Sequence, residues 1–254
     1  MAKGYSLHIG VRQVNLSAEA YIDEANLIPI HTAMNDVSAM VSIAMDFGYH
    51  PINILVNKQA TIENFKKECL IAAHELEAGD IFLLTFSGHG GQLHDENMDE
   101  GEKDDTDETL ALYDGHLIDD LIFEMFCKFE KGVRILFLPD SCFSGGVDEF
   151  VGTPLVYIPF SFHKKQKEKE TLETGLKATL LMISATTEEK TANQGDKYSD
   201  FTNAIYYMWQ QGALGKNYND FFYQLRDYDH SVQEQLGLIK NDYQDFINQS
   251  PFTI

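Results

Sequence analysis

Two short, continuous apolar runs constrain the fold of this 254-residue chain more than any other feature. Ile81–Phe86 and Val133–Leu138 each have the length of a strand and carry almost no polar side chains. Strands that are apolar on both faces are typical of a parallel sheet covered by helices on each side. A glycine-rich polar segment follows each run at once, at 87–92 and at 139–146. The sequence therefore predicts a parallel sheet with two polar loops leaving neighbouring strand ends.

Helical patterns separate these runs from further strand candidates. Apolar residues recur with helical spacing at 37–47, 65–76 and 118–129, and a glycine follows each segment. We expect Thr32 to cap the first of these helices. Additional strands are expected at 5–14, 52–56 and 178–184, and additional helices around 204–209 and 221–225. This alternation predicts one α/β domain over residues 1–254, with a mainly parallel central sheet flanked by helices on both faces.

Charge and cysteine content narrow the function classes. The chain has 19 Lys and Arg against 40 Asp and Glu, a formal charge of −21. Nucleic acids and anionic membranes are poor partners for such a chain, whereas cationic substrates or metal ions suit it. No apolar run approaches the roughly 20 residues of a membrane helix, and the N-terminus lacks a signal-peptide core. Three widely spaced cysteines favour a reducing compartment, so we expect a cytoplasmic protein.

Two segments have strongly biased composition. Residues 95–108 hold nine carboxylates and one lysine, and charge runs of this kind are commonly solvated surface loops. Residues 163–170 hold four lysines and almost nothing apolar, which indicates an exposed loop.

The two glycine-rich loops carry the residues best suited to chemistry. His89 follows the first apolar run and Cys142 follows the second. If the two strands are neighbours, an imidazole and a thiol face each other at the edge where open α/β sheets bind ligands. The imidazole can activate the thiol and protonate a leaving amine, while the N–H groups of Gly90 and Cys142 can hold an oxyanion.

Each residue alone has a simpler interpretation. A single histidine in a glycine-rich loop is commonly structural or exposed, and a single cysteine after a strand is commonly a small core residue. The joint placement of His89 and Cys142 favours catalysis. Cys69 and Cys127 fall on apolar faces of predicted helices, so we expect them in the core.

The residues around this pair resemble a known family. Phe86-Ser87-Gly88-His89-Gly90-Gly91 and Asp140-Ser141-Cys142-Phe143-Ser144-Gly145 are similar to the histidine and cysteine motifs of caspase-fold cysteine peptidases, above all the metacaspases and orthocaspases. The histidine precedes the cysteine by 53 residues (142 − 89), against about 50 in caspases. The caspase Gln-Ala-Cys signature is absent, and Asp-Ser-Cys stands in its place, as in metacaspases.

The resemblance extends over most of the chain. Segments 33–36, 104–109, 183–186 and 249–252 are similar to metacaspase segments, although Ala33 replaces a cysteine of the family pattern. The resemblance implies a large-subunit-like region at about 1–160, a lysine-rich activation loop at 161–175 and a small-subunit-like region at 176–254, with no further prodomain expected.

The resemblance also implies an acidic specificity pocket. The positions that match the metacaspase pattern are Asp36, Ser87 and Asp140, and they imply cleavage after Arg or Lys. A pair of carboxylates recognises a guanidinium through charge-assisted hydrogen bonds. Asp36 could instead cap a helix, and Asp140 could accept backbone N–H groups within its turn.

Two further expectations rest on the resemblance. Metacaspases often need calcium, and the residues matching their ligands by position are carboxylates: Asp104, Asp119, Asp120, and Asp148 or Glu149. Asp119 and Asp120 could equally belong to a solvated helix face. Members of the family are often cut after the catalytic cysteine, which implies self-cleavage at one of four lysines: Lys164, Lys165, Lys167 or Lys169. A plain solvated linker is the alternative.

The sequence thus favours a monomeric cysteine endopeptidase acting on peptides with Arg or Lys at the cleavage site. Three alternatives stay open. They are a clostripain-like or separase-like peptidase with another pocket, a catalytically silent caspase-fold interaction module, and an acidic calcium-binding protein without catalysis.

Overall fold

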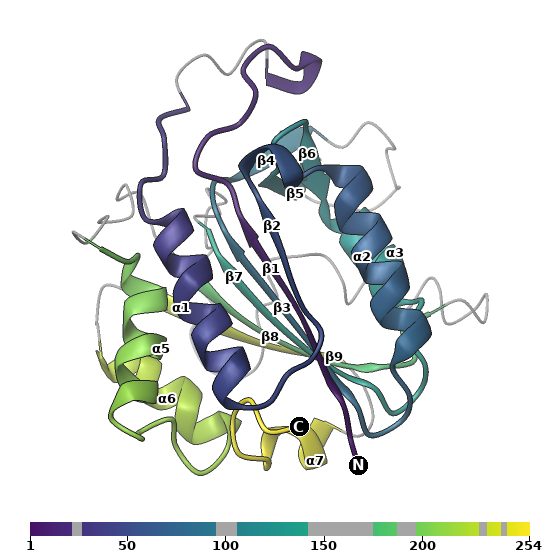
Figure 1. Cartoon of the computed structure of the whole chain (residues 1–254), viewed down its shortest axis with the longest axis vertical. Helices are drawn as coiled ribbons and strands as arrows, with labels where there is room; N and C mark the ends of the chain where they lie inside the picture. Colours follow the sequence, from purple (N-terminus) through teal and green to yellow (C-terminus); the bar gives the residue numbers. More distant parts are fainter. Residues whose placement is uncertain (22–26, 95–105, 142–174, 187–196, 229–232, 240–242) are drawn as a thin grey trace.

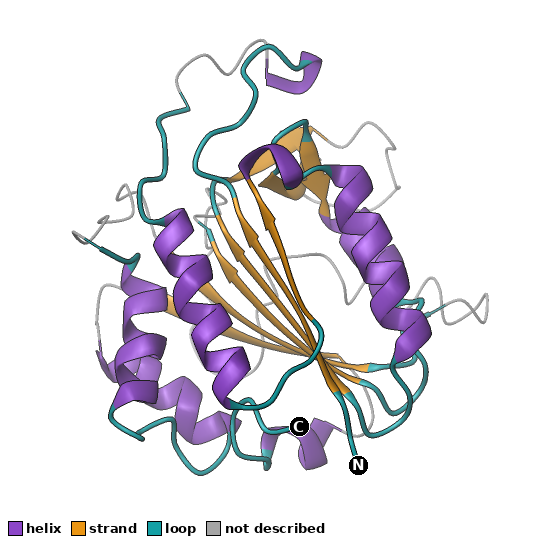
Figure 2. Cartoon of the chain, in the orientation of Figure 1, coloured by secondary structure: helices purple, strands orange, loops and turns teal. Residues whose placement is uncertain are grey.

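A six-stranded sheet forms the centre of the computed structural model (Figures 1 and 2). The structure describes residues 1–21, 27–94, 106–141, 175–186, 197–228, 233–239 and 243–254. The strands of the sheet are β1 (Gly4–Gly10), β2 (Ile52–Val56), β3 (Ile81–Ser87), β7 (Arg134–Asp140), β8 (Thr179–Thr186) and β9 (Gln233–Ile239). Their order is β2-β1-β3-β7-β8-β9. The first five are parallel and β9 runs antiparallel to β8, so the predicted mainly parallel sheet is confirmed.

Helices cover both faces of this sheet, as predicted (Figure 1). One face packs against α1 (Ala33–Asp46), α5 (Asp200–Gln210) and α6 (Tyr218–Tyr228), and the other against α2 (Ile62–Glu75) and α3 (Asp119–Phe126). Short helices at Glu19–Tyr21, Asn57–Gln59 and α7 (Tyr243–Ile247) complete the set for the described residues. None of the helices in the described ranges has the length and apolar character needed to cross a bilayer.

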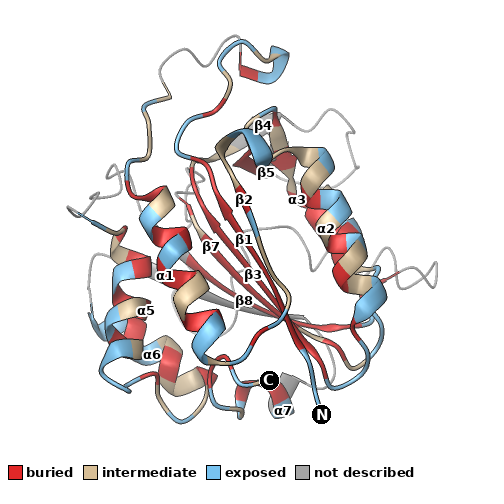
Figure 3. Cartoon of the chain, in the orientation of Figure 1, coloured by how far each residue is buried: buried red, intermediate tan, exposed pale blue. Residues whose placement is uncertain are grey.

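Each face of the sheet has its own apolar core (Figure 3). Alternate side chains of the buried strands enter opposite clusters: Phe82 and Leu84 face α2 and α3, whereas Ile81 and Leu83 face α1 and α5. This is why continuous apolar runs form these strands. Cys69 is buried in the first cluster and Cys127 packs against it half-buried, as expected from their helical positions.

A second, three-stranded antiparallel sheet follows β3 and was not predicted. It consists of β4 (Gly90–His94), β5 (Thr106–Ala111) and β6 (His116–Ile118). The expectation of a surface loop over 95–108 is therefore wrong at its end, because residues 106–108 lie in β5, and Glu108 is only 9% exposed. Glycine, aspartate and glutamate have low strand propensity, so the sequence pattern did not predict these strands, which are stabilised by pairing with one another.

The first strand is shorter than the predicted 5–14 span. β1 ends at Gly10, and the Val11 N–H makes a last bond to the Ser87 carbonyl at 2.9 Å. The next N–H, of Arg12, donates to the side-chain Oδ1 of Asn57 at 3.0 Å instead of to a neighbouring strand. The apolar residues Val11 and Val14 therefore belong to a loop rather than to the strand, and between them Arg12 and Gln13 are exposed.

Both ends of the chain lie near the end of the sheet at which the parallel strands begin (Figure 1). Arg134 at the start of β7 donates to the carbonyls of Gly79 at 2.8 Å and Thr253 at 3.1 Å. A side chain added at Gly4 would meet Ile254 at 2.6 Å, so the first strand and the last residue are in direct contact.

Candidate active site

Neighbouring strands β3 and β7 end side by side. Ser87, the last residue of β3, pairs in register with Asp140, the last residue of β7. The Gly88 N–H donates to the Asp140 carbonyl at 3.3 Å and ties the next loop to β7. The neighbouring strands on which the sequence argument depended are thus confirmed, and His89 leaves the sheet at this edge. Cys142 lies outside the described residues.

His89 is held by two hydrogen bonds from different parts of the chain. Its Nε2 lies 2.7 Å from the Ile28 carbonyl. Because a carbonyl can only accept, Nε2 carries the proton, and in the neutral ring Nδ1 is then the basic nitrogen. The His89 carbonyl accepts from the Ala111 N–H at 2.9 Å, so the second sheet fixes the backbone of this residue. The arrangement suits an imidazole that exchanges a proton at Nδ1.

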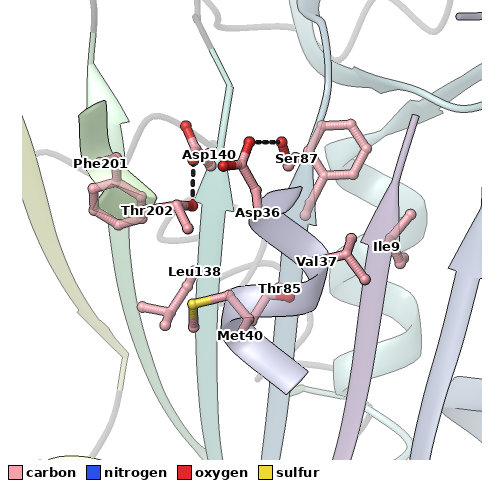
Figure 4. Close-up of a pocket in the computed structure, with 11 residues that line it drawn as sticks. Ile9, Asp36, Val37, Met40, Thr85, Ser87, Leu138, Asp140, Phe201 and Thr202 are labelled. Carbon is pink, nitrogen blue, oxygen red and sulfur yellow. Dashed lines mark hydrogen bonds between the residues drawn. The ribbon is translucent and has the colours of Figure 1, made fainter. Parts of the chain in front are cut away.

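The three residues predicted for the pocket lie together at this edge (Figure 4). Asp36, in the first turn of α1, is 1% exposed, and its Oδ2 accepts from the Ser87 Oγ at 2.8 Å. Asp140 is half-buried beside them. Asp36 bonds to a residue of β3 instead of capping its own helix. Thr32 stands at the N-cap position of α1 as predicted, but its side chain makes no capping bond.

The start of α5 completes this cluster. The Ser199 N–H donates to Asp36 Oδ1 at 2.9 Å, and the Ser199 hydroxyl donates to Asp140 Oδ2. The Thr202 hydroxyl donates to the same Oδ2 at 2.6 Å. Asp140 therefore bonds to a distant helix and not only within its own turn. The two carboxylates are joined through one residue, Ser199, which lies far along the chain from both.

Burial makes the charges of this pair costly. It raises the pKa of Asp36 to about 7, with a further increase from the charge of Asp140, against the opposing effect of its hydrogen bonds. Burial likewise raises the pKa of Asp140, and the hydroxyls of Ser199 and Thr202 oppose that rise. Within the described ranges, every hydrogen bond to these two side chains comes from a hydroxyl or an N–H and none from a cation. The pair is suited to receive a positive charge.

The floor of the pocket is apolar. Apart from Asp36, Ser87, Asp140 and Thr202, the lining consists of six apolar residues and one threonine: Ile9, Val37, Met40, Phe86, Leu138, Phe201 and Thr85; Figure 4 shows Met40 and Leu138 below the carboxylates. The enclosed space is about 10 Å³, room for roughly one water molecule.

Two of the five candidate calcium ligands are described. Asp119 and Asp120 form the first turn of α3; Asp119 is 0% exposed and its Oδ1 accepts from the Asp120 N–H at 2.9 Å. The solvated-face interpretation is therefore wrong for Asp119. Within the described residues, no group of three or more potential ligands gathers. The remaining candidate ligands (Asp104, Asp148, Glu149) and the candidate cleavage sites (Lys164, Lys165, Lys167, Lys169) lie outside the described residues.

Sequence reasoning missed three contributors to this edge. Ser199 stands directly before an apolar helical stripe, and this N-cap pattern could have located the start of α5. Nothing in the sequence linked Ser199 or Thr202 to Asp140, because contact between them depends on strand order. No sequence pattern could have identified the Ile28 carbonyl as the partner of His89, since every residue carries a backbone carbonyl.

Comparisons with known proteins agree with this architecture. The model of the caspase-domain family matches residues 18–239. The crystal structure of protein GSU0716 from Geobacter sulfurreducens covers 99% of both chains, with a TM-score of 0.77 and 28% identity. Caspase-1 from Spodoptera frugiperda covers 94% of this chain and 85% of its own, with a TM-score of 0.58. At 11% identity, that likeness concerns the fold alone.

Curated relatives are similar over shorter stretches. Metacaspase-4 of Arabidopsis thaliana is 33% identical over 128 residues, which is 46% of this chain and 30% of that protein. Metacaspase-1 of Schizosaccharomyces pombe is 29% identical over 180 residues, 65% of this chain and 40% of that protein. The chain thus spans less than half the length of either relative.

Proposed function

Because the chain belongs to the caspase-domain family, with metacaspases among its relatives, we propose that it is a cysteine endopeptidase cleaving after Arg or Lys. The observation that carries the specificity is the buried pair Asp36 and Asp140, which lacks any cationic partner among the described residues. A charged side chain of the substrate supplies that partner.

His89 is the acid and base of the proposed reaction. Its Nε2–H is engaged by the Ile28 carbonyl, so the ring holds one orientation and works through Nδ1. Nδ1 takes the proton of the Cys142 thiol and later donates it to the amine that leaves. The engaged Nε2–H also stabilises the imidazolium formed between these two steps.

Cys142 is the proposed nucleophile. Its sulfur attacks the carbonyl carbon of the scissile bond, and the N–H groups of Gly90 and Cys142 donate to the oxyanion. Collapse of this intermediate breaks the C–N bond and leaves an acyl-enzyme. Water, deprotonated by His89, then attacks the thioester and releases the carboxylic acid product.

A small peptide panel tests this function. Substrates ending in Arg, Lys, Asp or Leu before a reporter amine are compared on wild type and Cys142→Ala. We expect Arg and Lys substrates to be cleaved by the wild type only. Cleavage after Asp would overturn the pocket assignment. Binding of peptides without cleavage by either protein would favour the silent interaction module.

Calcium binding is a separate part of the proposal. Asp119 and Asp120 offer the oxygen ligands that calcium prefers, and the burial of Asp119 suits a compensated charge; bound calcium would add a fixed positive charge at the start of α3. Asp104 and Asp148 or Glu149 are the proposed remaining ligands. Calcium should raise the Tm of Cys142→Ala, magnesium should not, and Asp119→Asn should abolish the rise. An equal response of the Asn variant would refute this site.

Self-processing is proposed at one of the four lysines at 164, 165, 167 and 169. The support is chemical, since a peptidase with an acidic pocket accepts the lysines of its own chain. Mass spectrometry of wild type after turnover should find a cut there that Cys142→Ala lacks. An intact wild-type chain after turnover would refute it.

We further propose that the enzyme is a monomer of the reducing cytosol. The free thiols of Cys69 and Cys127 are compatible with such a compartment. Light scattering on a sizing column should give the mass of one chain, and a dimer mass would overturn the monomer assignment. Localisation is tested by fractionation of the source cells.

A further inference from the structure

The hydroxyls of Ser199 and Thr202 converge on a single oxygen. Both donate to Asp140 Oδ2, and the second oxygen of Asp140 points away from Thr202 (Figure 4). The Thr202 bond is 2.6 Å long, a distance typical of a hydroxyl on an ionised carboxylate. These contacts hold the carboxylate in one rotamer and leave its second oxygen without a hydroxyl donor from α5.

Helix capping does not explain the Thr202 hydroxyl. Ser199 caps α5 on its own, because its Oγ accepts the Thr202 N–H at 3.2 Å. A threonine in a first turn ordinarily points its hydroxyl to water or back to a carbonyl of its helix. Thr202 is instead 2% exposed, and its hydroxyl reaches a strand 62 residues away in sequence. The Thr202 hydroxyl is therefore not needed to form α5, and alanine or valine at this position would be compatible with the helix.

The two aspartates also receive unequal support. Asp36 has donors on both oxygens, Ser87 on Oδ2 and Ser199 N–H on Oδ1. Asp140 has both of its described hydroxyl donors on Oδ2, and the Thr202 N–H is a further donor that lowers its pKa. The remaining oxygen of Asp140 is thus the group best placed to meet an incoming cation.

We propose that Thr202, together with Ser199, is a positioning residue of the specificity pocket: its hydroxyl holds Asp140 so that Oδ1 faces the cationic side chain of the substrate. This inference rests on the proposed Arg or Lys specificity. The pocket is then built from α1, β3, β7 and α5, with the last element lying in the small-subunit-like region.

The test separates the pocket from the catalytic centre. An arginyl chloromethyl ketone needs the pocket to alkylate Cys142, whereas iodoacetamide alkylates a reactive thiol without it. We expect Thr202→Val, which keeps the shape and removes the hydroxyl, to slow the first reaction about tenfold and leave the second unchanged. Thr202→Ser should restore the wild-type rate, and peptide hydrolysis should show the loss in KM more than in kcat.

A second variant guards against a folding artefact. Ser199→Thr retains the hydroxyl and should behave as wild type, while Ser199→Ala should lower the rate with the ketone. Equal ketone rates for Thr202→Val and wild type would overturn the positioning role and leave the peptidase assignment intact. Parallel slowing with both reagents would overturn it as well, since a general structural role predicts that result. If the wild type reacts neither with the arginyl ketone nor with Arg or Lys peptides, the proposed Arg or Lys specificity itself is refuted.

Discussion

The protonation of Asp36 affects both the stability of the fold and the charge of the pocket. This residue is buried at the start of α1, and burial with the neighbouring Asp140 raises its pKa to about 7. An unfolded chain releases this proton near pH 4. Between about pH 4 and pH 7 the folded state therefore holds a proton that the unfolded state has lost, so stability falls as the pH rises through this range.

Replacing this carboxyl should stabilise the fold at alkaline pH. In a Cys142→Ala background, Asp36→Asn keeps an acceptor for the Ser199 N–H and removes the buried charge, while its amide N–H₂ donates to the Ser87 hydroxyl, which donates to Asp36 in the wild type. We expect its Tm to exceed that of the parent by roughly 3 °C or more at pH 8 and to match it near pH 4. In the active protein the same change should reduce cleavage after Arg at least about tenfold. A Tm difference independent of pH would contradict the assigned pKa.

His8 has the opposite linkage. It is fully buried in β1, its Nδ1 pairs with Thr85 Oγ1 at 2.9 Å, and its Nε2 has no hydrogen-bond partner among the residues that the structure describes. Burial lowers its pKa to about 3, so at moderately acid pH only the unfolded chain takes up a proton. Stability is therefore lost as the pH falls from about 6.5 toward 3.

A paired substitution isolates this effect. Between pH 7.5 and pH 5, wild type should lose about 2 kcal/mol more unfolding free energy than His8→Leu combined with Thr85→Val, which leaves no orphaned hydroxyl. Thr85→Val alone is the matched control and should retain the wild-type pH dependence. Urea titrations at the two pH values provide the measurement, and equal losses in all three proteins would exclude His8 as the cause.

At the level of elements, sequence patterns predicted five strands of the main sheet, including β2, which is only partly buried. β3, β7 and β8 follow from continuous apolar runs, because both of their faces meet helices. The β4–β6 sheet and β9 were missed, since their composition does not favour strands and only pairing stabilises them. The site divides in the same way. Motif positions indicated Asp36, Ser87 and Asp140, whereas the contribution of α5 depends on tertiary packing.

The start of α2 offers a prediction at this scale. Thr61 caps the helix, and its side chain accepts the Asn64 N–H at 3.2 Å. Thr61→Ala should cost about 1 kcal/mol, a fall in Tm of roughly 2–4 °C, because that N–H loses its partner. Thr61→Ser should restore the value, and alkylation of Cys142 by iodoacetamide should not change. A fall in Tm for the Ser variant as large as that for Ala would contradict the capping role.

Across the whole molecule, the regions on either side of the lysine-rich segment form one folded unit. β8 pairs with β7 in the middle of the sheet, and Leu136 and Leu181 share a core cluster with residues of α1 and α5. Arg134 also bonds to the carbonyl of Thr253. Cutting the chain between β7 and β8 therefore removes a covalent link without exposing this core.

This predicts that the two fragments stay together after cleavage. Brief trypsin treatment of Cys142→Ala should cut at the lysines of 164–169, which their composition predicts to be exposed, and should give two fragments on a denaturing gel. The same sample should elute at the volume of the intact chain on a sizing column. Separate elution of the fragments in native buffer would show that the covalent link holds the halves together.

The direct contact between Gly4 and Ile254 has a practical consequence. Gly4 begins β1 and both chain ends lie near the start of that strand (Figure 1), whereas His89 and Asp140 stand at the other ends of β3 and β7. A reporter or surface anchor fused at either end of this chain is therefore expected to lie away from His89 and Asp140. A short linker that joins the two ends, with new ends opened within the lysine-rich segment, would give a circular permutant in which that linker replaces the lysine-rich segment as the covalent connection between the two regions.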